Sequence, residues 1–454
     1  MTTLTQDAGL HVPVVTRPAP RRRFPAATCA VLAGTLAVLA FWWFGTPAAT
    51  GSTPGGALSA LGELAGLLAS FLVCVQLLLV ARVPWFETAV GQDRLVSWHR
   101  TLGTTVVLLV LTHVLLMIVG GALLDSLTPW AEVPNALARQ PYLWSAVIGT
   151  ALFVLVGLSS ARGARAHLSY EAWFALHLTT YVAIYLAFAH QVVGGTHFVT
   201  ALLARTVWVL LYAATAGAIL TWRVALPLLA HRQHQLRVAA VVPEGRGLTS
   251  IWLEGRDVAA LAAQGGQFFL VRFLTRGHWG TAHPYSLSMV PTAGHLRFTV
   301  GALGDHSSAV PHLRPGTRVL VEGPYGRFTA QRATAPKVLL VAGGAGVGPI
   351  RALAEDLLRA GHDLVVLHRA HDAESLALAA EFTPSAALRY VPLPGRRADL
   401  GHDPLHPSTL RHLVPDVAER DVFVCGPDGM IAAVVGAARS LGVPAGAIHR
   451  EELT

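Results

Sequence analysis

The chain has 454 residues, of which 53% are hydrophobic and only 13% are charged, and its formal net charge is +8 at pH 7. This length gives room for about three domains. The apolar surplus is concentrated in the first half, and the arginines are scattered among apolar runs, so the sequence indicates a membrane protein and excludes a nucleic-acid-binding one. Its cysteines, Cys29, Cys74 and Cys425, support neither a disulfide framework nor a cysteine metal site.

Six apolar runs in the first half are long enough to cross a membrane as helices. A hydrocarbon core about 30 Å thick requires roughly 20 apolar residues in helical form. We expect residues 1–25 to form a disordered cytoplasmic N-terminus and residues 26–225 to form a six-helix transmembrane bundle. The six spans are expected near 26–45, 58–81, 99–120, 143–159, 172–192 and 201–222.

The loops between these runs differ in charge. Those near 46–57, 121–142 and 193–200 carry few charged residues, whereas the other side is rich in arginine. Because cytoplasmic loops are enriched in basic residues, we predict a multi-pass protein of the plasma membrane, surrounded by lipid, with both termini in the cytoplasm. The arginines that mark this side are Arg21, Arg22, Arg23, Arg82, Arg94, Arg100, Arg162, Arg165, Arg223 and Arg232.

Four histidines stand inside the third and fifth spans, where ionisable residues are costly and usually functional. His99 and His113 are 14 residues apart, and His177 and His190 are 13 apart, so each pair covers roughly 20 Å along its helix. The two helices run in the same direction. His99 is therefore expected level with His177 near the cytoplasm, and His113 level with His190 near the outer side. Each level then offers two imidazoles, which is what axial ligation of a haem iron requires.

The spacing supports a shared helix face for His99 and His113 better than for His177 and His190. Fourteen residues leave two side chains about 40° apart around a helix, whereas 13 residues leave them about 140° apart, so His177 and His190 require a kink, a tilt or different rotamers. A lone intramembrane histidine often bonds only a neighbouring helix. Near the outer end, His197 and Arg205 are either surface residues or groups that help to receive an electron acceptor.

From about residue 233 the pattern changes to short alternating runs separated by glycine and proline. These predict an antiparallel β-barrel over 233–332. The continuous apolar strand 337–342, the amphipathic helix 350–358 and the strands 364–368 and 421–425 then predict a doubly wound α/β domain over 333–454. A glycine-rich turn at 343–349 joins the first of these strands to the helix. It favours a phosphate at the helix N-terminus, although its glycine spacing departs from the usual dinucleotide fingerprint.

Two further motifs, His283-Pro284-Tyr285-Ser286-Leu287-Ser288 and Cys425-Gly426-Pro427, complete a recognisable pattern. With the glycine-rich turn they resemble the FAD/NAD(P)-binding unit of ferredoxin reductases. Together with the four-histidine membrane domain, the chain from about residue 58 onward is similar to the ferric reductase and NADPH oxidase family.

The resemblance implies roles for individual residues. Tyr285, Ser286 and Cys425 would act beside the reacting flavin and nicotinamide rings, and Arg369 would face a ribose 2′-phosphate, which favours NADPH over NADH. In this family a Lys or Arg often stands where this chain has Gly301, and Arg297 is a possible substitute. The residues implied in cofactor binding are His283, Pro284, Tyr285, Ser286, Ser288, Gly304, Ser307, Gly343, Gly344, Gly346, Gly348, Pro349, Arg369, Cys425, Gly426 and Pro427.

A flavin is expected between the nicotinamide and the haems because it exchanges both electron pairs and single electrons. The sequence thus predicts an NAD(P)H-dependent oxidoreductase with FAD and two b-type haems that delivers electrons to an outer acceptor. A ferric or other metal chelate is favoured. Reduction of O2 to superoxide and transfer to a partner protein remain open, as does homo-oligomer formation.

Overall fold

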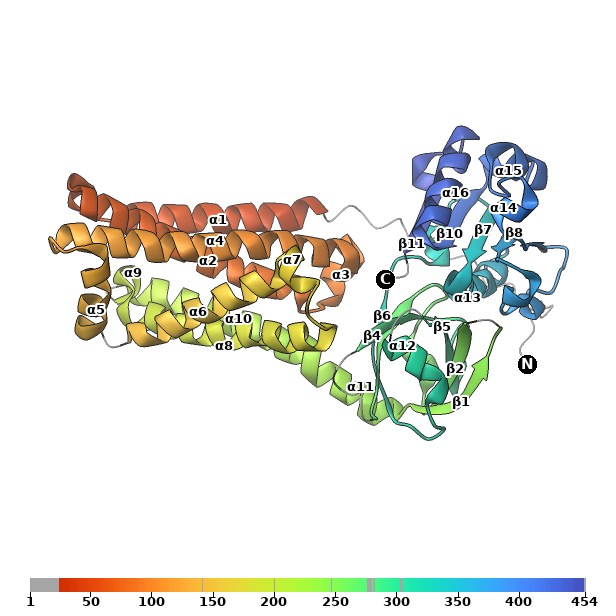
Figure 1. Ribbon diagram of the computed structural model, residues 1–454, viewed down its shortest axis with the longest axis horizontal. Coiled ribbons are helices and arrows are strands. Elements are labelled where there is room, and N and C mark those ends of the chain that lie inside the picture. Colours follow the sequence, from red (N-terminus) through yellow and green to blue (C-terminus); the bar gives the residue numbers. More distant parts are fainter. Residues whose placement is uncertain are drawn as a thin grey trace. The chain divides into compact units, whose positions relative to one another are not determined.

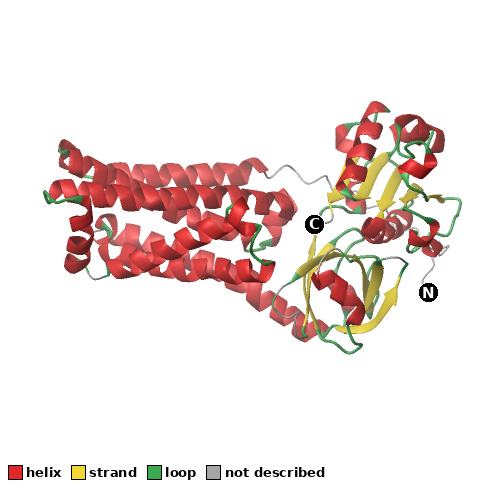
Figure 2. Ribbon diagram, in the orientation of Figure 1, coloured by secondary structure: helices red, strands yellow, loops and turns green. Residues whose placement is uncertain are grey.

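The computed structural model describes residues 24–140, 142–199, 201–245, 247–275, 280, 282–302 and 305–452. The chain divides into two compact units, with a boundary between Ala225 and Leu226. The first unit is helical, and all strands of the described residues belong to the second (Figures 1 and 2). The segment predicted to be disordered lies outside the described residues as far as residue 23.

Six helices in the described part of the chain are long and apolar enough to cross a membrane, which confirms the predicted number of spans. Their outer faces carry exposed apolar side chains such as Leu115, Leu158 and Leu210, as a lipid-facing surface requires. The last span continues through a π-helical turn into α11 (Leu226–His234). The six spans contain α1 (Phe24–Gly45), α2 (Pro54–Val80), α4 (Gln92–Leu124), α6 (Leu143–Ser160), α8 (Tyr170–Gly194) and α10 (Leu202–Ile219).

Small residues set the close approach of α2 to α4. A Cβ atom added at Gly62 would lie 3.1 Å from the sulfur of Met117, and one at Gly55 would lie 2.8 Å from the carbonyl oxygen of Gly120. Larger side chains there would push the two helices apart, because membrane helices associate through close packing rather than through the hydrophobic effect. Close packing against α2 therefore fixes the position of α4, the third span.

Two segments predicted as loops contain short helices, α3 (Pro84–Val90) and α5 (Pro129–Arg139). Each begins with proline and has a glutamate in its first turn, which suits the free amides and the positive dipole of a helix start. They lack the long apolar run by which spans are recognised, so the sequence prediction missed them. The remaining short helices of this unit are α7 (Arg162–Arg165) and α9 (Thr196–Val199).

After α11, the second unit contains six antiparallel strands in two three-stranded sheets, with orders β1-β2-β5 and β4-β3-β6. Phe269, Phe273 and Phe298 are fully buried between them. The antiparallel prediction is confirmed: the described strands pair as two small sheets linked by isolated bridges, and closure into a barrel stays a prediction. The strands are β1 (Arg237–Pro243), β2 (Leu248–Glu254), β3 (Phe268–Phe273), β4 (His283–Ser286), β5 (His295–Gly301) and β6 (Val319–Tyr325).

The rest of this unit is a parallel five-stranded sheet of order β11-β10-β7-β8-β9, in agreement with the predicted α/β domain. Val338 and Leu340 of β7 face a core with α13, whereas Leu339 and Val341 face a core with α16. Helices thus cover both faces. The elements are β7 (Lys337–Gly343), α13 (Val347–Arg359), β8 (Asp363–Arg369), β9 (Leu388–Leu393), α14 (Arg397–Leu400), α15 (Pro407–Leu413), β10 (Asp421–Gly426), α16 (Asp428–Ser440) and β11 (Ile448–Glu452), preceded by α12 (Asp305–Ala309).

An ion-pair cluster before β10 stabilises this sheet at neutral pH. Asp416 accepts hydrogen bonds from Arg420 at 2.8 and 2.9 Å and from Lys337 at 3.0 Å. The bonds from Arg420, followed by those from Lys337, lower the pKa of Asp416 from 3.8 to about 2. Because the folded pKa is the lower one, this stabilisation is present above pH 3.8 and is lost as the pH falls towards 2.

Asp416→Asn is therefore expected to lower the melting temperature at pH 7, with the difference from wild type vanishing near pH 2. Circular dichroism melts over this pH range measure the effect. Asp399→Asn, at an exposed position of α14, is the matched control. A difference that stays constant with pH would contradict the assignment.

Candidate functional site

The structure brings the four intramembrane histidines together as two pairs at two levels. The rings of His99 and His177 have centroids 6.0 Å apart, and those of His113 and His190 have centroids 6.4 Å apart. The unequal spacings of 14 and 13 residues therefore do not prevent α4 and α8 from presenting facing imidazoles at both levels.

Carbonyl groups of α2 orient the two histidines of α4. The Nδ1 atom of His99 lies 3.1 Å from the carbonyl oxygen of Gln76, and that of His113 lies 2.8 Å from the carbonyl oxygen of Gly62. A proton on Nδ1 donated to these oxygens leaves each Nε2 free as a ligand, as is usual for metal-bound histidine. Gly66 leaves room for the second ring, because a Cβ atom there would lie 2.8 Å from His113 Nδ1.

These pairs fit axial ligation of haem better than binding of a bare metal ion. A metal between two facing imidazoles, with bonds of about 2 Å, separates the ring centres by roughly 6 Å. The described residues hold no group of three or more His, Cys, Asp or Glu side chains that would enclose a bare ion. A porphyrin supplies its own equatorial nitrogens, so two imidazoles suffice. The Nδ1 atoms of His177 and His190 are buried without a hydrogen-bond partner among the described residues, which is the departure from the usual pattern.

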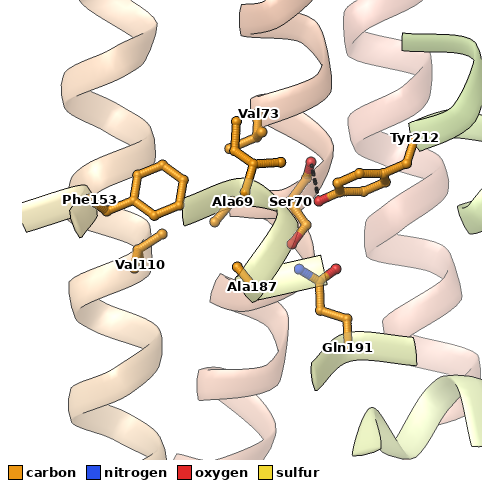
Figure 3. A pocket seen from close by; sticks show the side chains of 9 residues that line it. Ala69, Ser70, Val73, Val110, Phe153, Ala187, Gln191 and Tyr212 are labelled. Carbon is orange, nitrogen blue, oxygen red and sulfur yellow. Dashed lines mark hydrogen bonds between the residues drawn. The ribbon is translucent and has the colours of Figure 1, made fainter. Parts of the chain in front are cut away.

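A packed, mostly apolar layer separates the two histidine levels. It surrounds a cavity of about 30 Å³, large enough for a water molecule. Phe153 and Tyr212 lie on opposite sides of the cavity in Figure 3. The Tyr212 hydroxyl donates to the carbonyl oxygen of Ser70 at 3.4 Å. The full lining is Ala69, Ser70, Val73, Val110, Phe153, Ile184, Ala187, Gln191 and Tyr212.

One pair near the second level was missed by the sequence interpretation. Glu63 of α2 lies 3.2 Å from Nε2 of His197, whose side chain is only 7% exposed. His197 is thus a buried partner of an intramembrane carboxylate, and the surface role left open for it is wrong. The sequence does mark Glu63 as a candidate functional residue, because it is an acidic residue inside an apolar run. Arg205, considered with His197, is exposed.

The motif at residues 283–288, the flavin motif, begins with β4, which pairs with β3. Tyr285 is 8% exposed and packs against Phe273 and Phe298, each at a ring-centroid distance of 6.3 Å. Burial raises the pKa of Tyr285 above its usual value, so the phenol stays protonated. His283 and Ser286 are half-buried and Pro284 is exposed, so the open edge of the motif consists of these three residues.

Ser288 does not present a ligand surface. It is fully buried, and both its hydroxyl and its carbonyl oxygen accept hydrogen bonds from Arg297, at 3.0 and 2.9 Å. Arg297 in turn forms a buried ion pair with Glu381. Ser288 and Arg297 therefore already have partners within the protein, while the cofactor-binding role of Ser288 and the substitution of Arg297 at Gly301 stay predictions.

The glycine-rich turn begins where β7 ends. Gly344 has a φ of +54°, is exposed, and has open space where a side chain would point. Gly343, Gly346, Gly348 and Pro349 are buried beneath it. The turn thus offers one exposed backbone position directly before the N-terminus of a 13-residue helix, where free amides and the helix dipole favour phosphate.

The segment Cys425–Pro427 ends β10 and lies beside this turn, because a Cβ atom on Gly346 would meet the Cys425–Gly426 backbone. The Cys425 side chain is fully buried, and burial, together with Glu451, raises its pKa well above the usual value. Its thiol is therefore protonated at neutral pH and enclosed by protein in this conformation, so the segment contributes backbone and packing beside the turn.

The remaining residues predicted to bind a cofactor are Arg369, Ser307 and Gly304. Arg369 ends β8, and its Nη1 atom donates to the carbonyl oxygens of Ala370 and Leu393 at 2.5 and 2.8 Å. Burial and the neighbouring charge of Arg397 lower the pKa of Arg369. Ser307 is half-buried in α12, and Gly304 lies outside the described residues.

Comparison with known proteins places three of the four histidines in a region that matches a family model. Residues 65–188 match the ferric reductase like transmembrane component. This range includes His99, His113 and His177, and His190 follows two residues beyond it. With its six apolar helices, the chain is a multi-pass membrane protein.

Other relatives are named as an NADPH oxidoreductase, flavohemoproteins and a ferredoxin reductase component. The chain is 28% identical over 220 residues to an NADPH oxidoreductase of Mycobacterium tuberculosis, covering 46% of this chain and 57% of that protein. It is 30% identical over 231 residues to the ferredoxin reductase component of a 3-ketosteroid-9-alpha-monooxygenase of Mycolicibacterium smegmatis, covering 48% and 64%. The chain thus spans less than two thirds of these relatives. A solved cytochrome P450 reductase of Amycolatopsis is 23% identical, with a TM-score of 0.41 and coverage of 49% and 69%.

Proposed function

Because the chain fuses a ferric reductase-like transmembrane component to a ferredoxin-reductase-type FAD/NAD(P)-binding unit, we propose that it is a transmembrane NAD(P)H oxidoreductase. In this proposal electrons pass from NAD(P)H in the cytoplasm, by way of FAD and two b-type haems, to an acceptor on the outer side of the plasma membrane. The observation that carries the proposal is the pair of facing imidazoles at each of two levels, with centroid separations of 6.0 and 6.4 Å. A ferric or other metal chelate is the favoured acceptor.

Each group of residues has a distinct task in this function. The turn at Gly344 and the start of α13 would hold the dinucleotide phosphates, and His283, Pro284 and Ser286 would hold the flavin edge. His99 with His177 and His113 with His190 would supply the axial ligands. Flavin contributes the exchange between a hydride and single electrons, and haem contributes single-electron transport. The packed, mostly apolar layer between the levels, which has room for a water molecule, would keep ions out of the path.

Purified protein in detergent or liposomes tests the activity. We expect a Soret band and a flavin spectrum, and NADPH oxidation that is stimulated by ferric citrate. Oxidation that instead reduces a superoxide dismutase-sensitive dye would assign an oxidase. Flavin and haem reduction without turnover on either acceptor would assign transfer to a partner protein. Absence of haem from the purified protein would overturn the proposal.

Coenzyme choice is expected to depend on Arg369. Arg369 ends β8, and Arg397 lies close enough for its charge to act on it. Burial and the charge of Arg397 lower the pKa of Arg369. Such a positive site favours the ribose 2′-phosphate of NADPH. Arg369→Ala should lower the ratio of kcat/KM for NADPH to that for NADH roughly tenfold, the effect of losing about 1.4 kcal/mol. Arg389→Ala on β9 is the exposed control. An unchanged ratio would refute a role in coenzyme selection.

A further inference from the structure

A network of four charged side chains connects the antiparallel sheets to the α/β part of the same unit. Arg297 of β5 donates two hydrogen bonds to Glu381, of 2.6 and 3.0 Å. Glu381 also pairs with Nε of Arg351 of α13 at 2.7 Å, and Arg351 pairs with Glu355 at 2.5 Å. The two arginines are 3% and 2% exposed and the two glutamates 18% and 15%, so the network is largely shielded from water.

Both ends of this network reach the segments expected to hold the two cofactors. Arg297 binds Ser288, the last residue of the flavin motif, and the amide of Val290 donates to Glu355 at 3.2 Å. Arg351 lies two residues after Pro349, the last residue of the glycine-rich turn. The network therefore ties the flavin motif to the start of α13 from both directions.

Apolar contacts hold the same two segments at a fixed separation. A Cβ atom on Gly348 would lie 3.3 Å from the Cβ of Ser288 and 3.5 Å from that of Thr299, so the turn packs directly against the sheets. Ala352 of α13 belongs to the core of the antiparallel sheets, whereas Leu353 of the same helix belongs to the α/β core. Helix α13 is thus shared by both cores.

We propose that Arg297, Glu381, Arg351 and Glu355 are positioning residues that set the distance between the nicotinamide and the flavin. This inference rests on the proposed function. Hydride transfer requires the two rings in near-attack geometry, and a misplacement of about 1 Å can lower a rate about 100-fold. The phosphates would bind at the turn and the flavin at β4, so the network that joins them determines ring alignment rather than affinity for either cofactor. In this role the network would touch neither ring and would supply no proton.

Anaerobic stopped-flow flavin reduction by NADPH tests this proposal. Glu381→Gln keeps the shape of the side chain but removes the charge shared by the two arginines. We expect the limiting rate of flavin reduction to fall at least roughly tenfold, while the apparent Kd for NADPH changes less than about threefold. The flavin–nicotinamide charge-transfer absorbance should decrease with the rate. Hydrogen exchange at the amides of residues 343–352 in the ligand-free protein should increase.

The matched control is Glu419→Gln, which removes a glutamate that pairs with Lys337 at 3.1 Å but is 69% exposed and lies away from the network. It should leave all these values unchanged. If Glu381→Gln fails to retain FAD, Arg297→Lys tests the proposal instead, because it keeps the positive charge but cannot form both hydrogen bonds to Glu381. We then expect the limiting rate of flavin reduction to fall about threefold or more. Wild-type rates and charge-transfer absorbance in the folded variant would overturn the inference. Failure of the wild-type chain to reduce its flavin with NADPH would instead overturn the proposed function.

Discussion

Replacing both His113 and His190 with alanine should remove about half of the haem from the purified protein, because only one of the two levels would keep its axial ligands. The residual Soret band should come from the level of His99 and His177. Reduction of the flavin by NADPH should persist at the wild-type rate, since the flavin motif belongs to the other compact unit. Turnover with an outer acceptor should fall at least roughly 100-fold, because the path across the membrane is interrupted.

Haem content per polypeptide is measured as the pyridine haemochrome, and flavin reduction by stopped-flow absorbance. His167→Ala is the matched control, because this histidine is exposed between α7 and α8. It should keep full haem content and turnover. The complementary variant, with His99 and His177 replaced, should also lose about half of the haem, but from the other level. Undiminished haem in either double variant would contradict ligation by these side chains.

The parts of the fold that were predictable depend on long, regular patterns. The apolar runs around His113 and His190 identified spans that the structure confirms, since a membrane requires a run of fixed length. The alternation in β5 identified an antiparallel strand, and the continuous apolar run of β7 identified a buried parallel one. Such patterns reflect burial on one or both faces of an element, which the sequence records directly.

Contacts between distant segments were not predictable from these patterns. Nothing in the sequence links Arg297 to Glu381, which are 84 residues apart, or Glu63 to His197. Each pair forms because burial leaves a charge that requires a partner, and only the folded chain shows which partner is near. The same limit explains Ser288, whose place in a motif suggested a cofactor contact although its oxygens are bound by Arg297.

The glycine-rich turn provides the second large expected effect, through Gly346→Ala. A Cβ atom at this position would overlap the carbonyl group of Cys425 and lie 2.7 Å from the amide nitrogen of Gly426. That backbone cannot withdraw easily, because Cys425 is paired with Ala342 in the central sheet. The turn itself would have to move, and with it the amides at the start of α13 that would hold the phosphates.

We therefore expect Gly346→Ala to weaken NADP⁺ binding at least roughly tenfold, or about 1.4 kcal/mol, and to lower the melting temperature. Isothermal titration calorimetry measures the first effect and calorimetric unfolding the second. Gly436→Ala in α16 is the matched control, because no atom lies within 4 Å of its added Cβ atom and the helix favours alanine by about 0.5–1 kcal/mol. The control should bind NADP⁺ normally and melt at an equal or higher temperature. Normal NADP⁺ binding by Gly346→Ala would mean that the phosphates are held elsewhere, since a displaced turn could not keep the amides of α13 in place.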